Sequence, residues 1–357
     1  MRIRSFFAGL MLTAACADSS IPKAAPGVPI GPPQEPDSDL LALMSGEGSD
    51  PKAVSPEDKK KAEEAQKLVA DFAKLDAEQA AEKARMTDAV RKELATLSAK
   101  DFPTLRAALD AAIKSPHRAP GSAARDQQRH PAEMLDFFRV KTTSHVLELD
   151  AGAGWYTELL APTLSKKGKL VVTGPDPKGP RTERATLYGQ RLWGLLDKAP
   201  ELGAKVGYVV APSTGLSFTP ELENSFDVVL SFRNLHNWQR RGQLDKNLAE
   251  VFKVLKPGGV FAVEAHRAKP DADPKLSAEK GYLPEAFVIE RAVAAGFKKD
   301  ASSEMNANPK DTKDYADGVW ALPPTLLGGD KDKEKFLAIG ESDRMTIRFV
   351  KPGKGKK

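Results

Sequence analysis

The stretch VLELDAGAGWYTELLAP, residues 146–162, limits the possible fold more than any other part of the chain. It begins as an apolar strand, passes through a turn that contains Gly152 and Gly154, and continues with the apolar spacing of a helix. Glycine at such a turn lets the backbone approach a ligand closely, because no Cβ stands in the way. We therefore expect a strand, a tight turn and a helix that together receive a nucleotide-like cofactor.

Strand and helix patterns alternate along the chain from this stretch onward. Strands are expected at residues 145–150, 168–174, 205–211, 225–232, 260–266 and 343–351. Helices are expected at residues 155–164, 186–199, 243–255 and 283–297. This alternation predicts parallel βαβ units in a doubly wound open sheet, which binds its ligand at the carboxyl ends of the strands.

The first sixteen residues have the pattern of a bacterial export signal. Two arginines precede an apolar run over residues 6–12, and small residues then lead to Cys16, the only cysteine of the chain. The segment resembles the lipobox of bacterial lipoproteins, whose cysteine is lipidated, although Thr13 stands where leucine is usual. We expect an exported protein that is periplasmic or anchored to the membrane through Cys16. The alternative is cleavage near Ala15 and a soluble exported protein.

Two further segments precede the region of alternating strands and helices. Residues 17–56 are rich in proline, glycine and small polar residues, which is typical of a disordered linker. Residues 57–102 are strongly charged, and Leu68, Phe72 and Leu75 are spaced as on one face of a helix. This helical segment is either a partner-binding or coiled-coil arm or a solvated helix docked on the main domain. We favour the docked helix, because the apolar stripe does not continue over several heptads.

The glycine turn distinguishes two classes of cofactor. A dinucleotide-binding turn needs G-x-G-x-x-G, but Trp155, Tyr156 and Thr157 follow Gly154, so the third glycine is missing. Residues 226–238, FDVVLSFRNLHNW, and residues 251–267, VFKVLKPGGVFAVEAHR, resemble the fourth-strand and fifth-strand segments of class I S-adenosylmethionine-dependent methyltransferases. That fold holds no pyrophosphate, so its turn needs fewer glycines.

Several longer stretches narrow this resemblance. They are RDQQRHPAEMLDFF, GWYTELLAP, FRNLHNW, GYLPEAFVIERAVAAGFK, NANPKDTKDYADGVWALPPTL and ESDRMTIRFVKP. Together they look like a family of bacterial predicted methyltransferases, often exported, over residues 103–352, with a basic tail at 353–357. The resemblance implies an α/β, Rossmann-like, doubly wound and mostly parallel seven-stranded sheet. It also implies S-adenosyl-L-methionine as cofactor, and the charged helices add an N-terminal extension to this fold. The resemblance does not identify the substrate, which we expect to be a small molecule.

The resemblance also indicates which residues contact the cofactor. An acidic residue usually stands two places before the first glycine, and Glu148 fills that place, whereas Asp150 replaces the glycine itself. Aspartate tolerates left-handed backbone better than most residues, so the turn can persist. The carboxylate of Asp150 would either pair with the cationic groups of the cofactor, or cap the next helix or stay solvated. The expected cofactor-binding residues are Glu148, Asp150, Gly152, Gly154, Trp155, Tyr156, Asp176, Arg233 and Asn234.

Two departures from the family pattern bear on activity. The acid that usually ends the second strand and binds both ribose hydroxyls is replaced by Gly174, and Asp176 is the candidate substitute. Ala211 and Pro212 replace the residues that often touch the adenine after the third strand. A chain without these contacts would bind the cofactor weakly. The alternative function is therefore a catalytically inactive, exported ligand-binding or interaction protein on the same fold.

His236 is the candidate catalytic base. Methyl transfer to a hydroxyl or amine requires removal of a proton, and an unperturbed imidazole titrates near ~6.5. The alternative is that His236 and Trp238 only pack the loop after the fourth strand. His130 and His266 are more typical of structural hydrogen-bonding residues.

Polar residues near the same loop suggest further roles. Arg233, Asn234 and Asn237 can orient an anionic or carbonyl-bearing substrate. Arg125 and Arg129 can equally form an ion-pair network with Asp126. These two alternatives stay open at the level of sequence.

Composition disfavours other classes of function. The net charge of +5 is modest, and no stripe of basic and aromatic residues indicates nucleic-acid binding. The five histidines have no metal-binding spacing, and one cysteine cannot build a zinc centre. No G-x-S-x-G motif of a serine hydrolase occurs. We expect no nucleic acid and no metal, and contact with a membrane only through the possible anchor at Cys16.

Overall fold

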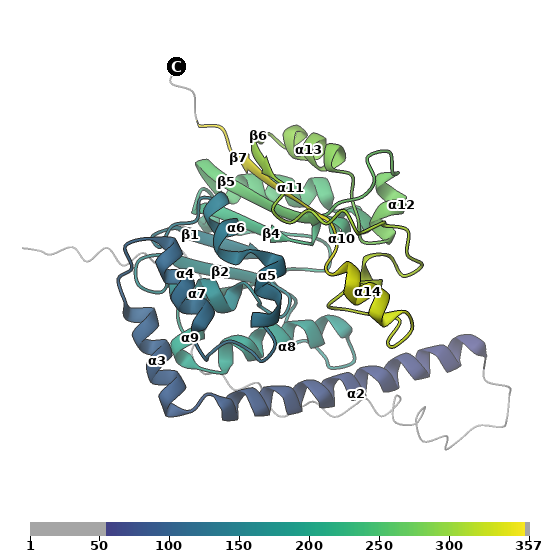
Figure 1. Cartoon of the computed structure of the whole chain (residues 1–357), viewed down its shortest axis with the longest axis horizontal. Coiled ribbons are helices and arrows are strands. Elements are labelled where there is room, and N and C mark those ends of the chain that lie inside the picture. The colour runs from purple at the N-terminus through teal and green to yellow at the C-terminus, as the bar shows by residue number, and fades with distance from the viewer. Residues whose placement is uncertain (1–54, 354–357) are drawn as a thin grey trace, which may run out of the picture.

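The computed structural model describes residues 55–353. The predicted signal peptide, the lipidation site at Cys16 and nearly all of the linker lie outside the described residues, as do residues 354–357 of the predicted tail. The remainder of the chain folds around one sheet flanked by helices (Figure 1).

The sheet has seven strands in the spatial order β3-β2-β1-β4-β5-β7-β6. The strands are β1 (His145–Leu149), β2 (Lys169–Gly174), β3 (Val206–Val210), β4 (Phe226–Phe232), β5 (Leu255–His266), β6 (Lys298–Ser303) and β7 (Arg344–Val350). The pairings among β1 to β5 are parallel, while β7 runs antiparallel to both β5 and β6. The predicted doubly wound, mostly parallel seven-stranded sheet is thus confirmed.

Fourteen helices of residues 55–353, one of them a 3-10 helix, surround the two faces of the sheet. Before β1 lie α2 (Pro56–Arg85), α3 (Asp88–Ala99), α4 (Leu105–Lys114), η1 (Ala123–Arg125), α5 (Asp126–Arg129) and α6 (Pro131–Phe137). Between β1 and β4 lie α7 (Thr157–Leu164), α8 (Arg184–Asp197) and α9 (Pro200–Gly203). After β4 lie α10 (Leu235–Arg240), α11 (Leu244–Val254), α12 (Pro274–Glu279), α13 (Glu285–Ala294) and α14 (Lys333–Ile339).

Side chains of the central strands alternate between two apolar layers. Val146 of β1 packs with residues of α3, α4, α6, α7, α8 and α9 on one face. Leu147, the next residue, packs with residues of α10, α11 and α13 on the other face. This alternation follows from the two-residue period of a strand, and burial on both faces explains why the central strands read as continuous apolar runs.

The charged N-terminal segment lies against the main domain. Leu68, Phe72 and Leu75 of α2 form a small buried cluster with Leu187 of α8. The Gln79 side chain of α2 also donates a hydrogen bond of 2.7 Å to the carbonyl oxygen of Gln190. Figure 1 shows α2 running beneath α8 and extending past it. The structure therefore agrees with the docked helix and gives no support to a free coiled-coil arm.

Two strand boundaries differ from the sequence expectations. Strand β6 was not expected, because KKDASS has no apolar residue larger than Ala301 to mark it as part of a core. It forms at the sheet edge, where pairing with β7 supplies its backbone hydrogen bonds. Strand β5 begins at Leu255 and includes the KPGG segment, which the sequence indicated only as the end of a helix.

None of the helices formed within residues 55–353 combines the length and apolar character required to cross a membrane.

Candidate cofactor and acceptor site

The turn after β1 combines three residues with left-handed backbone. Asp150 has a φ of 45°, as the sequence predicted for an aspartate in a glycine position, and Gly152 and Gly154 have φ values of 62° and 77°. A Cβ on Gly152 would meet only the carbonyl oxygen of Asp150, at 4.0 Å. The backbone at Gly152 is therefore open for close approach by a ligand.

Gly154 serves a different purpose from Gly152. A Cβ at this position would lie 2.0 Å from Leu195 Cδ2 of α8, so the glycine permits helix packing. Gly154 is also absent from the lining of the cavity next to the turn. A neighbouring helix thus fills the space that a side chain at position 154 would take, and a contact between Gly154 and the cofactor stays a prediction.

A cavity of about 260 Å³ lies at the carboxyl ends of β1 and β4. Strand order reverses between these two strands, which is where open α/β sheets bind ligands. The residues that line the cavity are Arg125, Arg129, Glu148, Leu149, Asp150, Ala151, Gly152, Ala153, Trp155, Tyr156, Phe232, Arg233 and Asn234. Seven of the nine predicted cofactor-binding residues therefore meet in one place, and the exceptions are Gly154 and Asp176.

Side chains after β4 hold the turn after β1 in position. Asn234 Nδ2 donates to the carbonyl oxygens of Leu149 and Asp150 at 3.2 and 3.3 Å. Trp238 Nε1 donates to Asp150 Oδ2 at 3.0 Å. Burial raises the pKa of the Asp150 carboxyl, while the hydrogen bond from Trp238 opposes this rise. Asp150 therefore neither caps the next helix nor stays solvated, but fastens the turn to α10.

Aromatic side chains form the apolar wall of the cavity. Tyr156 stacks on Phe232 with ring centroids 3.8 Å apart, and Trp155 meets Tyr156 edge-on at 4.6 Å. The Trp155 Nε1 donates to the carbonyl oxygen of Ser122 at 3.1 Å, which fixes the indole. These contacts make a rigid wall beside the glycine turn.

Three arginines line the same cavity. Arg125 Nε lies 2.9 Å and Arg129 Nε 3.4 Å from Glu341 Oε1, and Arg233 Nη1 lies 2.8 Å from Glu264 Oε2. The predicted ion-pair network is therefore present, but its carboxylates are not Asp126. Asp126 instead pairs with Arg118, which is not a lining residue. Sequence reasoning missed Glu341 because it lies more than 200 positions from its partners.

Gly174 stands where the family usually has the acid that binds the ribose, and neighbouring side chains leave no space for a side chain at this position. A Cβ there would lie 2.7 Å from the hydroxyl of Tyr208, which itself donates to the carbonyl oxygen of Pro175. Asp176 is exposed, and its Oδ1 accepts from the backbone N–H of Lys178 at 2.8 Å. Asp176 does not line the cavity, so its role as a substitute for the ribose acid stays a prediction.

Ala211 and Pro212, after β3, also differ from the family pattern of cofactor-contact residues. The backbone N–H of Ala211 donates to the carbonyl oxygen of Gly174, and Val210 before it is 45% exposed. The surface beyond β2 and β3 therefore offers apolar contact and no carboxylate at the two usual positions. The residues present fit the methionyl half of S-adenosylmethionine better than its adenosine half.

His236 is buried outside the cavity. Its ring centroid lies 5.6 Å from that of His266 and 6.0 Å from that of Trp320, and its Nδ1 has no hydrogen-bond partner. Burial, with smaller contributions from Arg240 and Arg233, lowers its pKa to about 3. Such an imidazole is neutral at pH 7 but a weak base, so the geometry favours the packing alternative. The catalytic role of His236 stays a prediction.

His266 and His130, which the sequence suggested as structural residues, lie in different parts of the molecule. His266 Nδ1 is 2.6 Å from Ser342 Oγ, which agrees with the expected structural hydrogen bond. His130 has a left-handed backbone with a φ of 43° and lines a second pocket. Within residues 55–353 no group of three histidine, cysteine, aspartate or glutamate side chains is placed to hold a metal ion.

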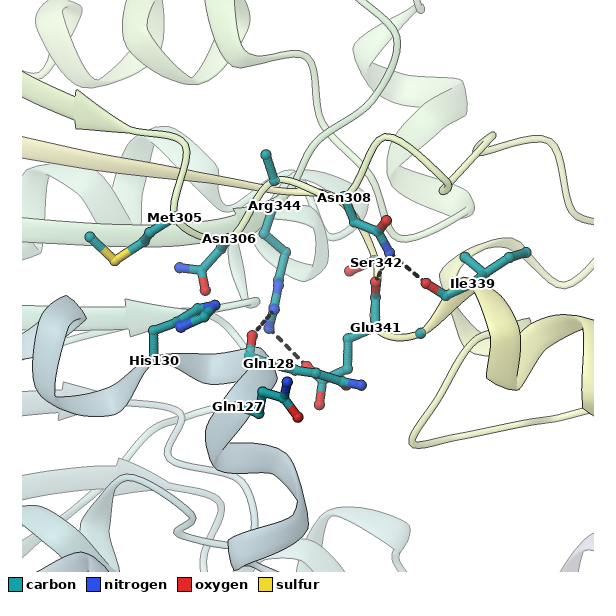
Figure 2. Close-up of a pocket in the computed structure, with 12 residues that line it drawn as sticks. Gln127, Gln128, His130, Met305, Asn306, Asn308, Ile339, Glu341, Ser342 and Arg344 are labelled. Atoms are coloured by element: carbon teal, nitrogen blue, oxygen red, sulfur yellow. Dashed lines mark hydrogen bonds and ion pairs between the residues drawn. The ribbon is translucent and has the colours of Figure 1, made fainter.

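The second pocket, of about 310 Å³, lies between the start of β7, the loop after β6 and the α5–α6 connection. Figure 2 shows Arg344 reaching from β7 toward Glu341 and the backbone of Gln128, while Asn308 Nδ2 donates to the carbonyl oxygens of Ile339 and Glu341. Glu341 thus lines this pocket and also pairs with two arginines of the first cavity. The two cavities are neighbours that share one carboxylate.

Comparison with known proteins agrees with this fold. A family model described as a methyltransferase domain matches residues 147–263, which include the glycine turn, the whole of β4 and the greater part of β5. The match agrees with the predicted methyltransferase domain over these residues. It does not test the exported family to which the longer stretches are similar.

Two curated relatives are C-methyltransferases. The chain is 27% identical over 136 residues to the ubiquinone/menaquinone biosynthesis C-methyltransferase of Hydrogenovibrio crunogenus, covering 38% of this chain and 46% of that protein. It is 30% identical over 147 residues to the botryococcene C-methyltransferase of Botryococcus braunii, covering 41% and 34%. The chain thus spans less than half the length of the curated relatives it matches.

Similar solved structures include a S-adenosylmethionine-dependent methyltransferase from Aquifex aeolicus. It is 16% identical and has a TM-score of 0.43, with 70% of this chain and 100% of that chain covered. The 1,6-didemethyltoxoflavin-N1-methyltransferase of Burkholderia thailandensis is 17% identical with a TM-score of 0.39, covering 70% and 87%.

We predict that Glu148 makes the free energy of unfolding fall as the pH rises from about 5 to about 8. The carboxyl is buried and accepts from Thr157 Oγ1 at 2.7 Å. Burial raises its pKa to about 8. The folded state then binds the proton over a range in which the unfolded chain has lost it, so stability present in acid is lost on going to alkaline pH. One proton contributes at most about 1.4 kcal/mol per pH unit.

Urea denaturation of wild type and Glu148→Gln at several pH values measures this effect, since glutamine keeps the shape but cannot ionise. The variant should lack the decrease in the free energy of unfolding that Glu148 causes between pH 5 and pH 8. A control change at the exposed Glu63, Glu63→Gln, should retain this decrease. Stability curves of wild type and Glu148→Gln that run parallel from pH 5 to pH 8 would contradict the prediction.

We further predict that His236→Ala reduces stability more than it reduces cofactor affinity. Removing a buried ring of this size should cost about 2 kcal/mol or more. The affinity for S-adenosylhomocysteine, by calorimetry, should change by less than about threefold, because His236 does not line the cavity. His145→Ala, at the partly exposed start of β1, is the control and should cost less than about 1 kcal/mol. Unchanged stability with a loss of turnover would instead favour His236 as the base.

Proposed function

We propose that the protein is an S-adenosylmethionine-dependent methyltransferase that acts on a small molecule. The observation that carries the proposal is the open backbone of Gly152 at a cavity where the strand order reverses. The methyltransferase-domain match over residues 147–263 supports it. When bound, S-adenosylmethionine supplies an electrophilic methyl group attached to sulfur.

Residues of this chain would mainly bind and orient the two reactants. Gly152 lets the main chain approach the methionyl part, and Asn234 keeps the turn in place through the carbonyl oxygens of Leu149 and Asp150. The stacked rings of Tyr156 and Phe232 exclude water from one wall. Because His236 lies outside the cavity, we expect alignment of the acceptor with the methyl group to be the principal contribution to catalysis.

Calorimetry with S-adenosylmethionine and S-adenosylhomocysteine tests the proposal. Wild-type protein should bind both, and Gly152→Leu should abolish binding because its side chain would fill the open space at the turn. Gly258→Leu is a matched control, since Gly258 has a φ of 82° and open space around it but lies near the opposite end of the parallel strands. No heat at millimolar ligand with folded wild-type protein would refute the proposal and favour an inactive protein on this fold.

We also propose that the chain is exported and begins, when mature, at a lipidated Cys16. The charged start, the apolar run over residues 6–12 and the small residues before the cysteine support this location. Mass spectrometry of the native protein should find a diacylglyceryl-modified Cys16 as the first residue, and Cys16→Ser should remove the lipid. An intact N-terminal methionine on protein recovered from the cytosol would contradict export.

A further inference from the structure

Positive charge exceeds negative charge in the ion-pair network beside the cavity. Four arginines, Arg125, Arg129, Arg233 and Arg344, share the carboxylates of Glu264 and Glu341. Glu341 is ionised, because Arg129, Arg344 and Arg125 outweigh the opposing effect of burial and hold its pKa at about 2. Two positive charges of the network therefore have no carboxylate of their own. A buried charge is costly unless it is paired, so this excess requires an explanation.

Arg129 is the most deeply buried of the three network arginines that line the cavity. Its side chain is only 3% exposed, and its Nε makes one long contact of 3.4 Å with Glu341. Its guanidinium lies 4.6 Å from the ring centroid of Trp155. Within residues 55–353 its two terminal nitrogens donate no hydrogen bond to the protein. Because Arg129 lines the cavity, these donors are available to a ligand there.

The surroundings of Arg129 penalise its charge. Burial, assisted by the nearby charges of Arg233 and Arg125, lowers its pKa to about 9. Arg125 and Arg233 line the same cavity, and each contacts its glutamate through one nitrogen only. Three guanidinium groups with remaining donors thus converge on one cavity. Such a group suits the planar oxygens of a carboxylate or phosphate.

The cofactor does not neutralise this charge. S-adenosylmethionine carries an ammonium, a sulfonium and one carboxylate, so it brings a net positive charge to the site. If the proposed function holds, the loaded site is more positive than the empty one. We propose that the methyl acceptor carries a carboxylate or phosphate group and that Arg129, with Arg125 and Arg233, binds that group.

Inorganic phosphate is the probe for this anion site. It is titrated into protein saturated with S-adenosylhomocysteine, at an ionic strength held constant with chloride, and binding is followed by calorimetry and by the rise in unfolding temperature. Phosphate should bind the loaded wild-type protein. Arg129→Gln should weaken phosphate binding by about tenfold or more, since it removes charge-assisted hydrogen bonds, while the affinity for S-adenosylhomocysteine stays within about threefold.

Arg118→Gln is the matched control variant. Arg118 is likewise buried and lies over Trp155 at 5.4 Å, but it is paired with Asp126 and does not line the cavity. Arg118→Gln should leave phosphate affinity unchanged. If Arg129→Gln does not fold, Arg125→Gln provides the test at a more exposed position, where the side chain is 26% exposed.

The outcomes separate this inference from the proposed function. Competition between S-adenosylhomocysteine and phosphate, or equal loss of both in Arg129→Gln, would assign the arginines to the carboxylate of the cofactor and overturn the inference. Failure of phosphate to bind the loaded protein would also overturn it, while the methyltransferase proposal would stand. Failure of S-adenosylhomocysteine itself to bind would overturn the proposed function and, with it, this inference.

Discussion

The ends of β1 and β4 are joined by side-chain hydrogen bonds on which the geometry of the site depends. Asn234 bridges the carbonyl oxygens of Leu149 and Asp150, and Trp238 binds the Asp150 carboxylate. These bonds occupy the polar groups of the turn that would otherwise be buried without partners. The backbone of Gly152 consequently projects into open space, while Gly154 beside it packs under α8. One short turn thus provides both a ligand-facing surface and a helix contact.

Two buried glutamates beside the cavity have opposite protonation. Glu148 has a hydroxyl as its hydrogen-bond partner, and burial raises its pKa to about 8. Glu341 is also buried, but three surrounding arginines hold its pKa at about 2. The first carboxyl therefore belongs to the neutral core at pH 7, whereas the second offsets part of the arginine charge. The cavity as a whole remains positive, which favours anionic ligands over neutral ones.

The side chains around Gly174 explain why this position holds a glycine and not the acid of the family pattern. Tyr208 of the adjacent strand β3 places its hydroxyl 2.7 Å from the position that a Cβ at residue 174 would take, and that hydroxyl donates to the carbonyl oxygen of Pro175. A side chain at position 174 would require Tyr208 and Leu192 to move. The glycine and the tyrosine therefore form one alternative arrangement of the β2 end, and the cavity lies on the β1 and β4 side of the sheet.

The sequence by itself determined six of the seven strands and the left-handed turn at Asp150, and its resemblance to a family indicated the neighbourhood of Glu148, Gly152 and Asn234. The strands and the turn follow from local patterns of apolar residues and glycines, since strand, turn and helix preferences act over a few residues. Strand β6 was not predicted from the sequence, because KKDASS has no apolar face and forms a strand only by pairing with β7.

Only the tertiary structure decided the charge and basicity of the site. The pairing of Arg125 and Arg129 with Glu341 joins residues more than 200 positions apart, which no local pattern encodes. The place of His236 just after β4 suggested a catalytic base, yet burial against His266 and Trp320 leaves its imidazole weakly basic. Electrostatic properties depend on burial and on neighbours brought together by folding, so they become defined only when the whole domain is assembled.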